Sequence, residues 1–385
     1  NPRHPRSHYY LISKCPNFNI MAHRRQFIKQ IGVGAAALAV GASAFPNIIF
    51  KKKKEHVNVA LMGLGYYSTD LLAPALQLTK HCKLAGIVTG SPEKAARWQQ
   101  QHRLSDQNIY NYDNFDSIAN NPDIDVVYVV LPPFLHKDFV VRAANAGKQV
   151  WCEKPMAMTE AECQTMIDAC AKNKVKLTIG YRMQHEPNTQ QIIRYGREKT
   201  FGQVKFVTAS AGFRAGWQKW TDHWKMEQNK GGGAMYDMGV YSLNAARYCV
   251  GEEPIAVVAQ EKTDEPERFA KADETTMFQL EFPSGALANC MTSLGMNINT
   301  LEVTAENGWY RLQPFQQYNG IKGMNSRGEV IDHFIENQQT KQMDDNALAI
   351  LNNTAVLVPG EEGMRDIRVV EAIQKSAREG RRITI

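Results

Sequence analysis

The sequence predicts an α/β protein in two domains: an N-terminal domain built on a parallel sheet, and a C-terminal α+β domain with an open, mostly antiparallel sheet. From His56 to Arg182, short β-branched runs alternate with helical patterns, which is typical of βαβ units. Beyond Gly202 the chain becomes rich in strand patterns separated by tight-turn signals. About 330 residues follow an N-terminal leader, more than one typical core. We therefore expect a leader at 1–54 and domains at 55–182 and 183–385.

The leader has the pattern of a twin-arginine export signal. Its motif RRQFIK at 24–29 precedes an apolar run at 31–44, which is broken by three glycines and is shorter than the roughly 20 residues that a spanning helix needs. Ala-Ser-Ala at 42–44 supplies the small residues of a cleavage site. We expect export to the periplasm by the twin-arginine route, without stable membrane insertion. An ordinary Sec signal is the alternative.

The apparent basicity of the chain belongs to this leader. Residues 1–54 hold ten Lys/Arg and no Asp/Glu, so the remainder carries 35 basic against 39 acidic residues, a balance of −4. The part of the chain after the leader therefore lacks the excess of basic residues that nucleic-acid binding needs, and we expect no nucleic-acid partner. Met21 is the expected initiator, which makes 1–20 upstream sequence, and 51–54 forms a short basic linker.

Six cysteines follow the leader, and they show no CxxC or Cys/His spacing suited to zinc. Cys152 sits in an apolar strand, while Cys163 and Cys170 lie on a predicted helix. We expect buried reduced thiols and no metal, in preference to a disulfide or metal framework.

Strands and helices alternate through the first domain. The strand patterns lie at 57–65, 83–90, 125–133, 148–155 and 176–182, and the helical patterns at 71–78, 94–101 and 159–172. The strand at 125–133 has the near-continuous apolar core of a strand that is covered on both faces. This order predicts a Rossmann dinucleotide-binding domain.

The second domain is predicted from hairpin patterns and two helices. The strand-rich segments are 203–213, 253–263, 275–294 and 299–312, and the last two contain Pro-Ser-Gly and Asn-Gly turns. One helix is expected near 234–249. A closing helix within 360–382 places Ile367, Val370, Ile373 and Ala377 on one face, and docking back on the first domain is left open.

The turn after the first strand has the residues of a dinucleotide-binding loop. Gly63-Leu64-Gly65 follows a strand and opens a helix, which directs backbone N–H groups and the positive helix end at a pyrophosphate. The third position of the fingerprint is Ser68 instead of glycine, so the motif alone also fits a plain tight turn. Tyr66 and Tyr67 are expected to pack against the dinucleotide; the alternative is that they are only packing residues of the core.

The end of the second strand favours NADP over NAD. An NAD site normally has a carboxylate here for the ribose 2′-hydroxyl. This chain instead has Thr89 and Ser91, with Lys94 one turn later, and these groups suit a 2′-phosphate that a carboxylate would repel. The plain alternative is that Lys94 is a solvated lysine at a helix start.

Two motifs, CEKP at 152–155 and GGGAMYDMGVYSLNAARY at 231–248, resemble the Gfo/Idh/MocA family of dehydrogenases. The resemblance runs from Val57 to Ile385 and includes LPPFLH, IGYR, GEEP and PGEEGMRDIR. It implies a Rossmann domain joined to an open-faced α/β domain, with the active site between them. It is strongest to the glucose–fructose oxidoreductase branch, whose type member is periplasmic and holds NADP tightly. Tyr241, where many relatives have His, fits that branch, but the short linker lacks its proline-rich arm, which puts an arm-dependent tetramer and a non-dissociating cofactor in doubt.

The resemblance also implies cofactor-side residues at the ends of the later strands. They are Leu131, Pro132, His136, Glu153, Lys154 and Arg182. His136 is equally compatible with capping a helix.

Three residues are expected to carry the chemistry. Lys154 lies at the carboxyl end of a strand, where ligands of such sheets bind, and its ammonium can hold a sugar hydroxyl and stabilise oxyanion character. Asp237 and Tyr241 are four apart and share one helix face, so Tyr241 can take the hydroxyl proton while Asp237 orients the sugar or the tyrosine. A solvated helix face is the alternative. Three glycines at 231–233 weaken it, because they let the backbone approach something closely.

We therefore expect an exported NADP-dependent oxidoreductase that converts an aldose to its lactone at C1; reduction of a second sugar is left open. Sugar contacts are expected from Lys154, Arg182, Trp224, Asp237 and Tyr241, and Trp217 is as easily a packing residue. An open sheet face needs cover, which suggests a homo-oligomer, a dimer or a tetramer. The alternatives are an NAD(P)-dependent glycosidase that oxidises its sugar transiently, and a non-catalytic sugar-binding protein.

Overall fold

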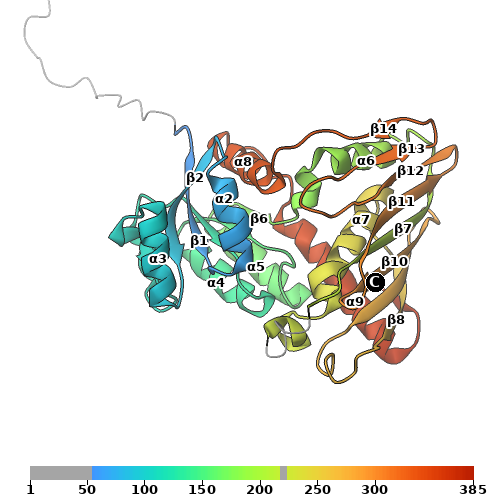
Figure 1. Cartoon of the computed structure of the whole chain (residues 1–385), viewed down its shortest axis with the longest axis horizontal. Coiled ribbons are helices and arrows are strands. Elements are labelled where there is room, and N and C mark those ends of the chain that lie inside the picture. The colour runs from blue at the N-terminus through green and yellow to red at the C-terminus, as the bar shows by residue number, and fades with distance from the viewer. Residues whose placement is uncertain (1–53, 217–222) are drawn as a thin grey trace, which may run out of the picture. The chain divides into compact units, whose positions relative to one another are not determined.

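The structure, a computed structural model, describes residues 54–216 and 223–385. The leader motifs and Trp217 lie outside the described residues. Within the described ranges, no helix combines the length and apolar character needed to cross a bilayer. Two sheets with their helices make up this part of the chain (Figure 1).

The first sheet has six parallel strands in the order β3-β2-β1-β4-β5-β6. Their bounds are β1 Val57–Met62, β2 Cys82–Val88, β3 Ile109–Tyr110, β4 Val126–Val129, β5 Gln149–Cys152 and β6 Leu177–Ile179. This order confirms the predicted Rossmann arrangement, in which ligands bind beyond the carboxyl ends of the strands near the β1/β4 reversal. The edge strand β3 was not predicted, because two residues are too few to show a pattern.

Helices flank this sheet in the expected alternation. They are the π-helical turn Tyr67–Leu72 continuing into α2 Ala73–Leu76, α3 Pro92–His102, α4 Pro133–Asn145 and α5 Glu160–Lys172. Side-chain caps define two of the starts: Ser91 accepts the Lys94 N–H at α3, and Thr159 accepts the Glu162 N–H at α5. All four residues of β4 are buried, as expected of a strand covered on both faces.

The second sheet has nine strands in the order β14-β13-β12-β11-β7-β10-β9-β8-β15. Their bounds are β7 Val204–Gly212, β8 Ala256–Lys262, β9 Thr275–Glu281, β10 Leu287–Ser293, β11 Ile298–Ala305, β12 Gly308–Leu312, β13 Gly323–Asn325, β14 Val330–Ile331 and β15 Ile383–Thr384. Every neighbouring pair is antiparallel except β7 and β10, which run parallel. The prediction of a mostly antiparallel sheet is therefore confirmed.

Helices of the same chain cover one face of this sheet, and among the described residues no helix covers the other face. α7, Val240–Val250, packs on β7 and β10, and inward side chains such as Val207 and Ala209 are buried. On the outward face, Phe206, Met277 and Leu287 are exposed. The alternation of buried and exposed side chains along each strand produces this difference.

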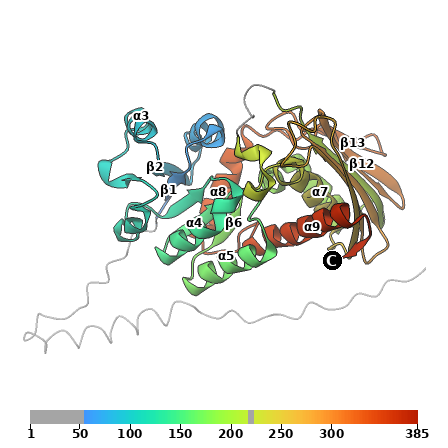
Figure 2. The same ribbon diagram turned by 90° about the horizontal axis from the view of Figure 1, so that it is seen from below.

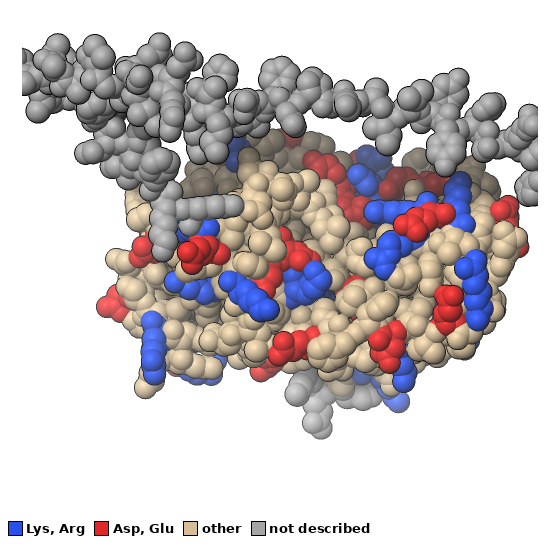
Figure 3. Space-filling model, turned by 90° about the horizontal axis from the view of Figure 1, so that it is seen from above, with Lys and Arg blue, Asp and Glu red and all other residues tan. Residues whose placement is uncertain are grey.

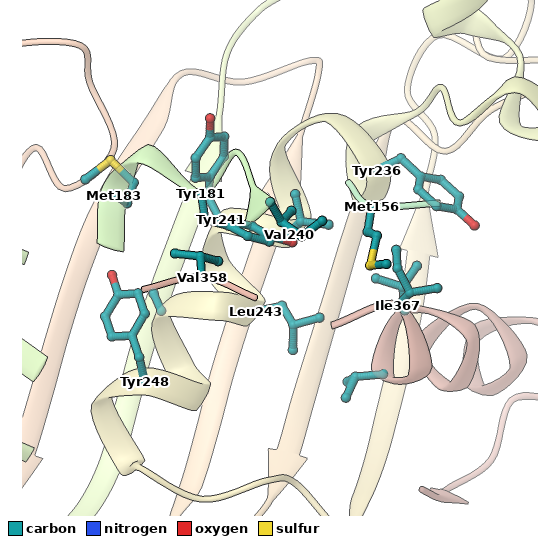
Figure 4. Close-up of a cluster of buried hydrophobic side chains, with 14 of the residues drawn as sticks. Met156, Tyr181, Met183, Tyr236, Val240, Tyr241, Leu243, Tyr248, Val358 and Ile367 are labelled. Atoms are coloured by element: carbon teal, nitrogen blue, oxygen red, sulfur yellow. The ribbon is translucent and has the colours of Figure 1, made fainter. Parts of the chain in front are cut away.

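The closing helix α9, Gly360–Glu379, packs against both α5 and β8 (Figure 2). Its predicted apolar face is buried at Ile367, Val370 and Ile373. Figure 4 shows Ile367 of α9 in the same cluster of buried side chains as Val240 and Leu243 of α7. These residues belong to a hydrophobic cluster that also contains β4 and β5 side chains, so the core of the second sheet continues into the first.

Three α-helices of the described residues escaped the sequence analysis: α4, α6 Pro187–Arg197 and α8 Gln338–Leu351. α8 returns the chain to the first sheet, where its Met343 and Ala347 join a cluster with β1 side chains. The rest of its buried face is polar and includes Gln338, Gln342 and Asn346. Because amides replace most of the apolar stripe, hydrophobic periodicity did not reveal this helix.

The six cysteines of the described residues are all buried and outside disulfides, which agrees with buried thiols. Figure 3 shows Lys/Arg and Asp/Glu side chains intermingled on one face, without separation into areas of one sign. In the described ranges, no group of three or more His, Cys, Asp or Glu side chains is arranged to hold a metal ion.

Candidate active site

The structure brings Lys154, Asp237 and Tyr241 together. Lys154 follows β5, Asp237 lies in the π-helical turn Met235–Gly239, and Tyr241 lies in the first turn of α7. The Lys154 ammonium donates a 2.8 Å hydrogen bond to the backbone carbonyl of Asp237 and lies 4.5 Å from the centre of the Tyr241 ring. The Lys154 ammonium is thus the group that joins the three residues, because it contacts the backbone of Asp237 and the ring of Tyr241.

The carboxylate of Asp237 has a partner that the sequence analysis did not single out. Lys225 Nζ lies 2.9 and 2.8 Å from its two oxygens. Burial alone would raise the pKa of Asp237, but Lys225 and Lys154 outweigh it and hold this pKa below its usual value. A lysine directly after Trp224 and ahead of the glycine triplet was the available signal.

Arg182 lies beside the same tyrosine, in a 3-10 segment that follows β6. Its guanidinium carbon is 5.5 Å from the Tyr241 ring centre and 4.5 Å from that of Tyr318. The backbone carbonyls of Gln316 and Gln317 accept hydrogen bonds from it at 2.5 and 3.0 Å. Arg182 therefore attaches the segment after β12 to the site, and it brings in Tyr318, which no local pattern marks.

The charge of Arg182 is maintained although the side chain is buried. Burial disfavours the guanidinium, but the neighbouring hydroxyls of Tyr241, Tyr67 and Tyr318 hold its pKa above the ordinary value. A fixed cation at this place favours negative charge that develops nearby.

Glu153, next to Lys154, is buried, and the Tyr128 hydroxyl donates to it at 2.5 Å. Gln342 of α8 donates to the same hydroxyl at 2.8 Å. Desolvation raises the pKa of Glu153 to about 7, although Tyr128 and Lys154 act in the opposite direction. A Cβ on Gly180 would lie 2.5 Å from this carboxylate, so the glycine of the GYR motif makes room for it.

The glycine loop after β1 has the geometry of a dinucleotide-binding turn. Gly63 has φ +89°, and a Cβ there would lie 2.3 Å from the Val130 carbonyl oxygen, so only glycine fits. A Cβ on Gly65 would meet nothing within 4 Å, so the loop is open on that side. Ser68, at the unusual third position, donates a 2.6 Å hydrogen bond to the Gly63 carbonyl and thereby closes the turn. These residues fit a bound dinucleotide.

The residues predicted for a 2′-phosphate lie beside this loop. Lys94 Nζ donates to the Leu64 carbonyl at 3.1 Å, so its ammonium reaches the turn from α3. Thr89 Oγ1 accepts the Ser91 N–H at 3.3 Å. The structure therefore places the Lys94 ammonium at the glycine loop, while the contribution of Thr89 and Ser91 to a phosphate site stays a prediction.

His136 is fully buried, and both of its ring nitrogens face backbone carbonyls. Nδ1 lies 3.0 Å from the Pro155 oxygen, and Nε2 lies 2.7 Å from the Leu131 oxygen. This geometry ties the segment after β4, Leu131 and Pro132, to the segment after Lys154. His136 thus supports the two strand ends from inside.

The predicted aromatic residues differ in their placement. Tyr66 is 66% exposed, whereas the Tyr67 ring lies 6.4 Å from that of Tyr318, on the side of Arg182. Trp224 is half-buried in the 3-10 turn Trp224–Met226, directly before Lys225. Its role in sugar contact stays a prediction.

Comparison with known proteins agrees with this arrangement. Residues 57–181 match the profile of the "Oxidoreductase family, NAD-binding Rossmann fold", and residues 189–311 match the "GFO/IDH/MocA C-terminal domain". The crystal structure of aldose-aldose oxidoreductase from Caulobacter crescentus, complexed with glycerol, shares 40% identity and covers 86% of this chain and 100% of that chain, with a TM-score of 0.82.

Two curated relatives are more distant. D-xylose 1-dehydrogenase (NADP(+)) from Haloarcula marismortui is 27% identical over 339 residues, 83% of this chain and 91% of that protein. The 2,7-anhydro-N-acetylneuraminate hydratase of Escherichia coli is 25% identical over 236 residues, 60% of each chain.

Proposed function

Because the chain belongs to the Gfo/Idh/MocA family of oxidoreductases, we propose that it is an exported NADP-dependent enzyme that oxidises an aldose at C1 to the lactone. The observation that carries this proposal is the meeting of Lys154, Asp237 and Tyr241, with the lysine 2.8 Å from the aspartate carbonyl and 4.5 Å from the tyrosine ring centre. The 40% identity to an aldose-aldose oxidoreductase over that protein's whole length supports a sugar substrate.

Each residue of the site has a distinct part in this reaction. A bound nicotinamide dinucleotide supplies the hydride acceptor for the sugar C1. Tyr241, acting as its phenolate, takes the proton of the C1 hydroxyl and becomes the neutral phenol, while Lys154 and Arg182, against the tyrosine ring, stabilise negative charge on the phenolate and on the reacting oxygen. The Asp237 carboxylate, kept ionised, accepts a hydrogen bond from a sugar hydroxyl and so orients the ring.

NADP is the proposed cofactor because Lys94, Thr89 and Ser91 stand where a carboxylate would select NAD. The name of the archaeal xylose dehydrogenase, which includes NADP(+), supports the same choice. The reverse sequence of steps would reduce a second aldose, and the name of the Caulobacter enzyme motivates that part of the proposal.

Export by the twin-arginine route and a homo-oligomer complete the proposal. The RRQFIK motif supports the route, which carries folded proteins and therefore allows a cofactor to travel with its enzyme. The exposed apolar side chains on the outward face of the second sheet, such as Phe206, Met277 and Leu287, support a covering copy of the chain.

The test begins with the purified full chain. Denaturation releases any bound nucleotide for identification, and we expect NADP(H). Aldoses are then screened for their ability to reduce bound NADP, followed by its absorbance, with lactone identified as the product. Finding no nucleotide, or no aldose that changes the absorbance, would contradict the proposal. Release of a phenol from a nitrophenyl glycoside without added nucleotide would instead favour the glycosidase.

A further inference from the structure

Two lysines approach Asp237 and contact different parts of it. Lys225 Nζ bridges the two carboxylate oxygens at 2.9 and 2.8 Å, whereas Lys154 Nζ donates to the backbone carbonyl at 2.8 Å. The side chains of Lys225 and Asp237 are 25% and 13% exposed, so the ion pair is largely withdrawn from water. Among the described residues, the Asp237 carbonyl is the hydrogen-bond acceptor of the Lys154 ammonium, which has three donors.

The glycine triplet is what lets Lys225 reach this place. Gly233 N–H donates to the Lys225 carbonyl at 2.8 Å, and a Cβ on Gly232 would lie 2.4 Å from that same oxygen. A Cβ on Gly233 would lie 2.0 Å from a carboxylate oxygen of Asp273. The close approach expected from the glycines is therefore to the backbone of the turn that carries Lys225 and to Asp273.

We propose that Lys225 is a positioning residue of the sugar site: it holds both oxygens of the Asp237 carboxylate and keeps that carboxylate away from Lys154, whose ammonium stays directed at the reacting sugar oxygen. This inference deepens the proposed function and rests on it. Lys225 acts through Asp237 and Lys154, so we do not assign it a catalytic role.

Without Lys225, the Asp237 carboxylate could pair with Lys154 instead, and that pairing would disturb the site. Lys154 already touches the Asp237 backbone, so a carboxylate released by loss of Lys225 has a second ammonium within reach. A largely buried carboxylate without a partner is costly, which drives it to that ammonium. Lys154 would then be engaged by the carboxylate instead of the sugar, and Asp237 would lose its fixed orientation.

Five ionisable side chains of the described residues face Asp237. They are Lys225 in the 3-10 turn, His223 directly before that turn, Lys154 after β5, Tyr318 after β12 and Tyr241 one helical turn along. Burial opposes ionisation of Asp237, and Lys225, followed by Lys154, does most to lower its pKa, with a smaller contribution from His223. Lys225 is therefore the residue whose removal should change the titration of Asp237 most.

The experiment compares Lys225→Met and Lys225→Arg with the parent enzyme carrying its bound nucleotide. The matched control is Lys230→Met, which removes a lysine from the same segment that pairs with Glu227 at 2.8 Å. We expect Lys225→Met to lower kcat roughly tenfold or more and to move the acid limb of kcat/KM upward by about 1 pH unit or more. Lys225→Arg, which keeps the charge, should restore the acid limb, and the control should resemble the parent.

A second readout does not depend on sugar oxidation. The carboxyl group of Asp237 is titrated by carbon-13 NMR in aspartate-labelled protein, with its signal assigned by Asp237→Asn. We expect its pKa to rise in Lys225→Met and to return in Lys225→Arg. An unchanged pKa overturns the inference whatever the enzyme oxidises.

The experiment distinguishes failure of the proposed function from failure of the positioning role of Lys225. If the parent oxidises no aldose, the proposed function fails, and the Asp237 titration alone decides whether Lys225 controls that carboxylate. If the parent is active but Lys225→Met keeps its kcat and acid limb, the positioning role is overturned. A loss of kcat that arginine does not relieve, without a shift of the acid limb, also overturns it.

Discussion

Lys154 Nζ lies 4.5 Å from the centre of the Tyr241 ring, although Lys154 follows a strand of the first sheet and Tyr241 lies in α7, which packs on the second sheet. The hydrogen bond from Lys154 to the Asp237 carbonyl joins the end of β5 to the turn that leads into α7. A cation against a phenol ring can stabilise the phenolate form, which is the form that accepts the proton of the sugar hydroxyl. The geometry thus couples the lysine and the tyrosine as one unit, which the following substitutions test.

Lys154→Ala should reduce kcat by roughly 10²- to 10³-fold, because it removes the donor that stabilises the reacting oxygen. The nucleotide should remain bound, since the glycine loop and Lys94 are untouched. Steady-state turnover and the nucleotide content after denaturation measure the two effects. Turnover near the parent level would refute the assignment of Lys154.

Tyr241→Phe should lower kcat by roughly 10²- to 10⁴-fold with little change in stability. The substitution deletes the proton-accepting hydroxyl but keeps the ring that packs in the core (Figure 4). Thermal unfolding of both proteins provides the control for folding. A Phe variant with the kcat of the parent would assign the proton to another group.

Lys94→Ala should lower the ratio of NADP(H) to NAD(H) released on denaturation by roughly tenfold or more, because a charged partner of the 2′-phosphate is lost. Lys83→Ala removes an exposed lysine at the amino end of β2 and should leave the ratio unchanged. If the parent and Lys94→Ala release NADP(H) and NAD(H) in the same ratio, Lys94 does not bind the 2′-phosphate.

Glu153→Gln should stabilise the protein near neutral pH. The pKa of Glu153 is raised to about 7 from an ordinary 4.5, so the folded state binds this proton more tightly than the unfolded chain. The stability that it contributes is therefore fully present below about pH 4.5 and is lost as the pH rises through about 7. Glutamine does not ionise, so the difference in free energy of unfolding between variant and parent should grow as the pH rises across this range.

Denaturant unfolding at several pH values measures this effect, with Glu198→Gln, an exposed glutamate, as the control. A difference between Glu153→Gln and the parent that does not vary with pH would contradict the raised pKa.

Arg247→Met should destabilise the protein by about 3–5 kcal/mol, because it leaves buried Asp366 without its cation. Arg247 of α7 also pairs with Glu362 of α9 at 3.1 Å, so the network holds these two helices together. Arg365→Met removes a 45% exposed arginine that also pairs with Glu362, and should cost at most about 1 kcal/mol. Denaturant unfolding measures the loss of stability in each variant. Equal losses in Arg247→Met and Arg365→Met would contradict the argument that burial makes the Arg247 pair the stronger one.

The parts of the site that local sequence could predict are those that depend on a single turn or strand end. Gly63 was recognisable because its positive φ and close approach to Val130 belong to a strand–turn–helix unit. Lys94 and Thr89 were recognisable because they follow the next strand at a set distance. Lys154, Asp237 and Tyr241 were expected at one site from a strand end and a helical spacing, and the structure places the Lys154 ammonium against the Asp237 backbone and the Tyr241 ring.

For other features the local sequence signal was weak or absent. Lys225 reaches the Asp237 carboxylate only because the backbone of the glycine triplet packs closely against the 3-10 turn that carries this lysine. Tyr318 lies in an irregular segment that Arg182 draws to the site. α8 was missed because much of its buried face is made of amides, whose contacts, such as Gln342 to Tyr128 of β4, involve residues far away in the chain.

The sequence by itself determined most strands and helices of the first domain, the strand-rich character of the second, the dinucleotide turn and the residue types of the site, because these depend on side-chain periodicity and on backbone conformations within a few residues. Only the tertiary structure decided which charge pairs with which. Asp237 is shared between two lysines, and Glu153 is buried against Tyr128. Such pairings follow from the distances between segments far apart in the chain, and from the burial that strengthens or penalises each charge at the position where folding places it.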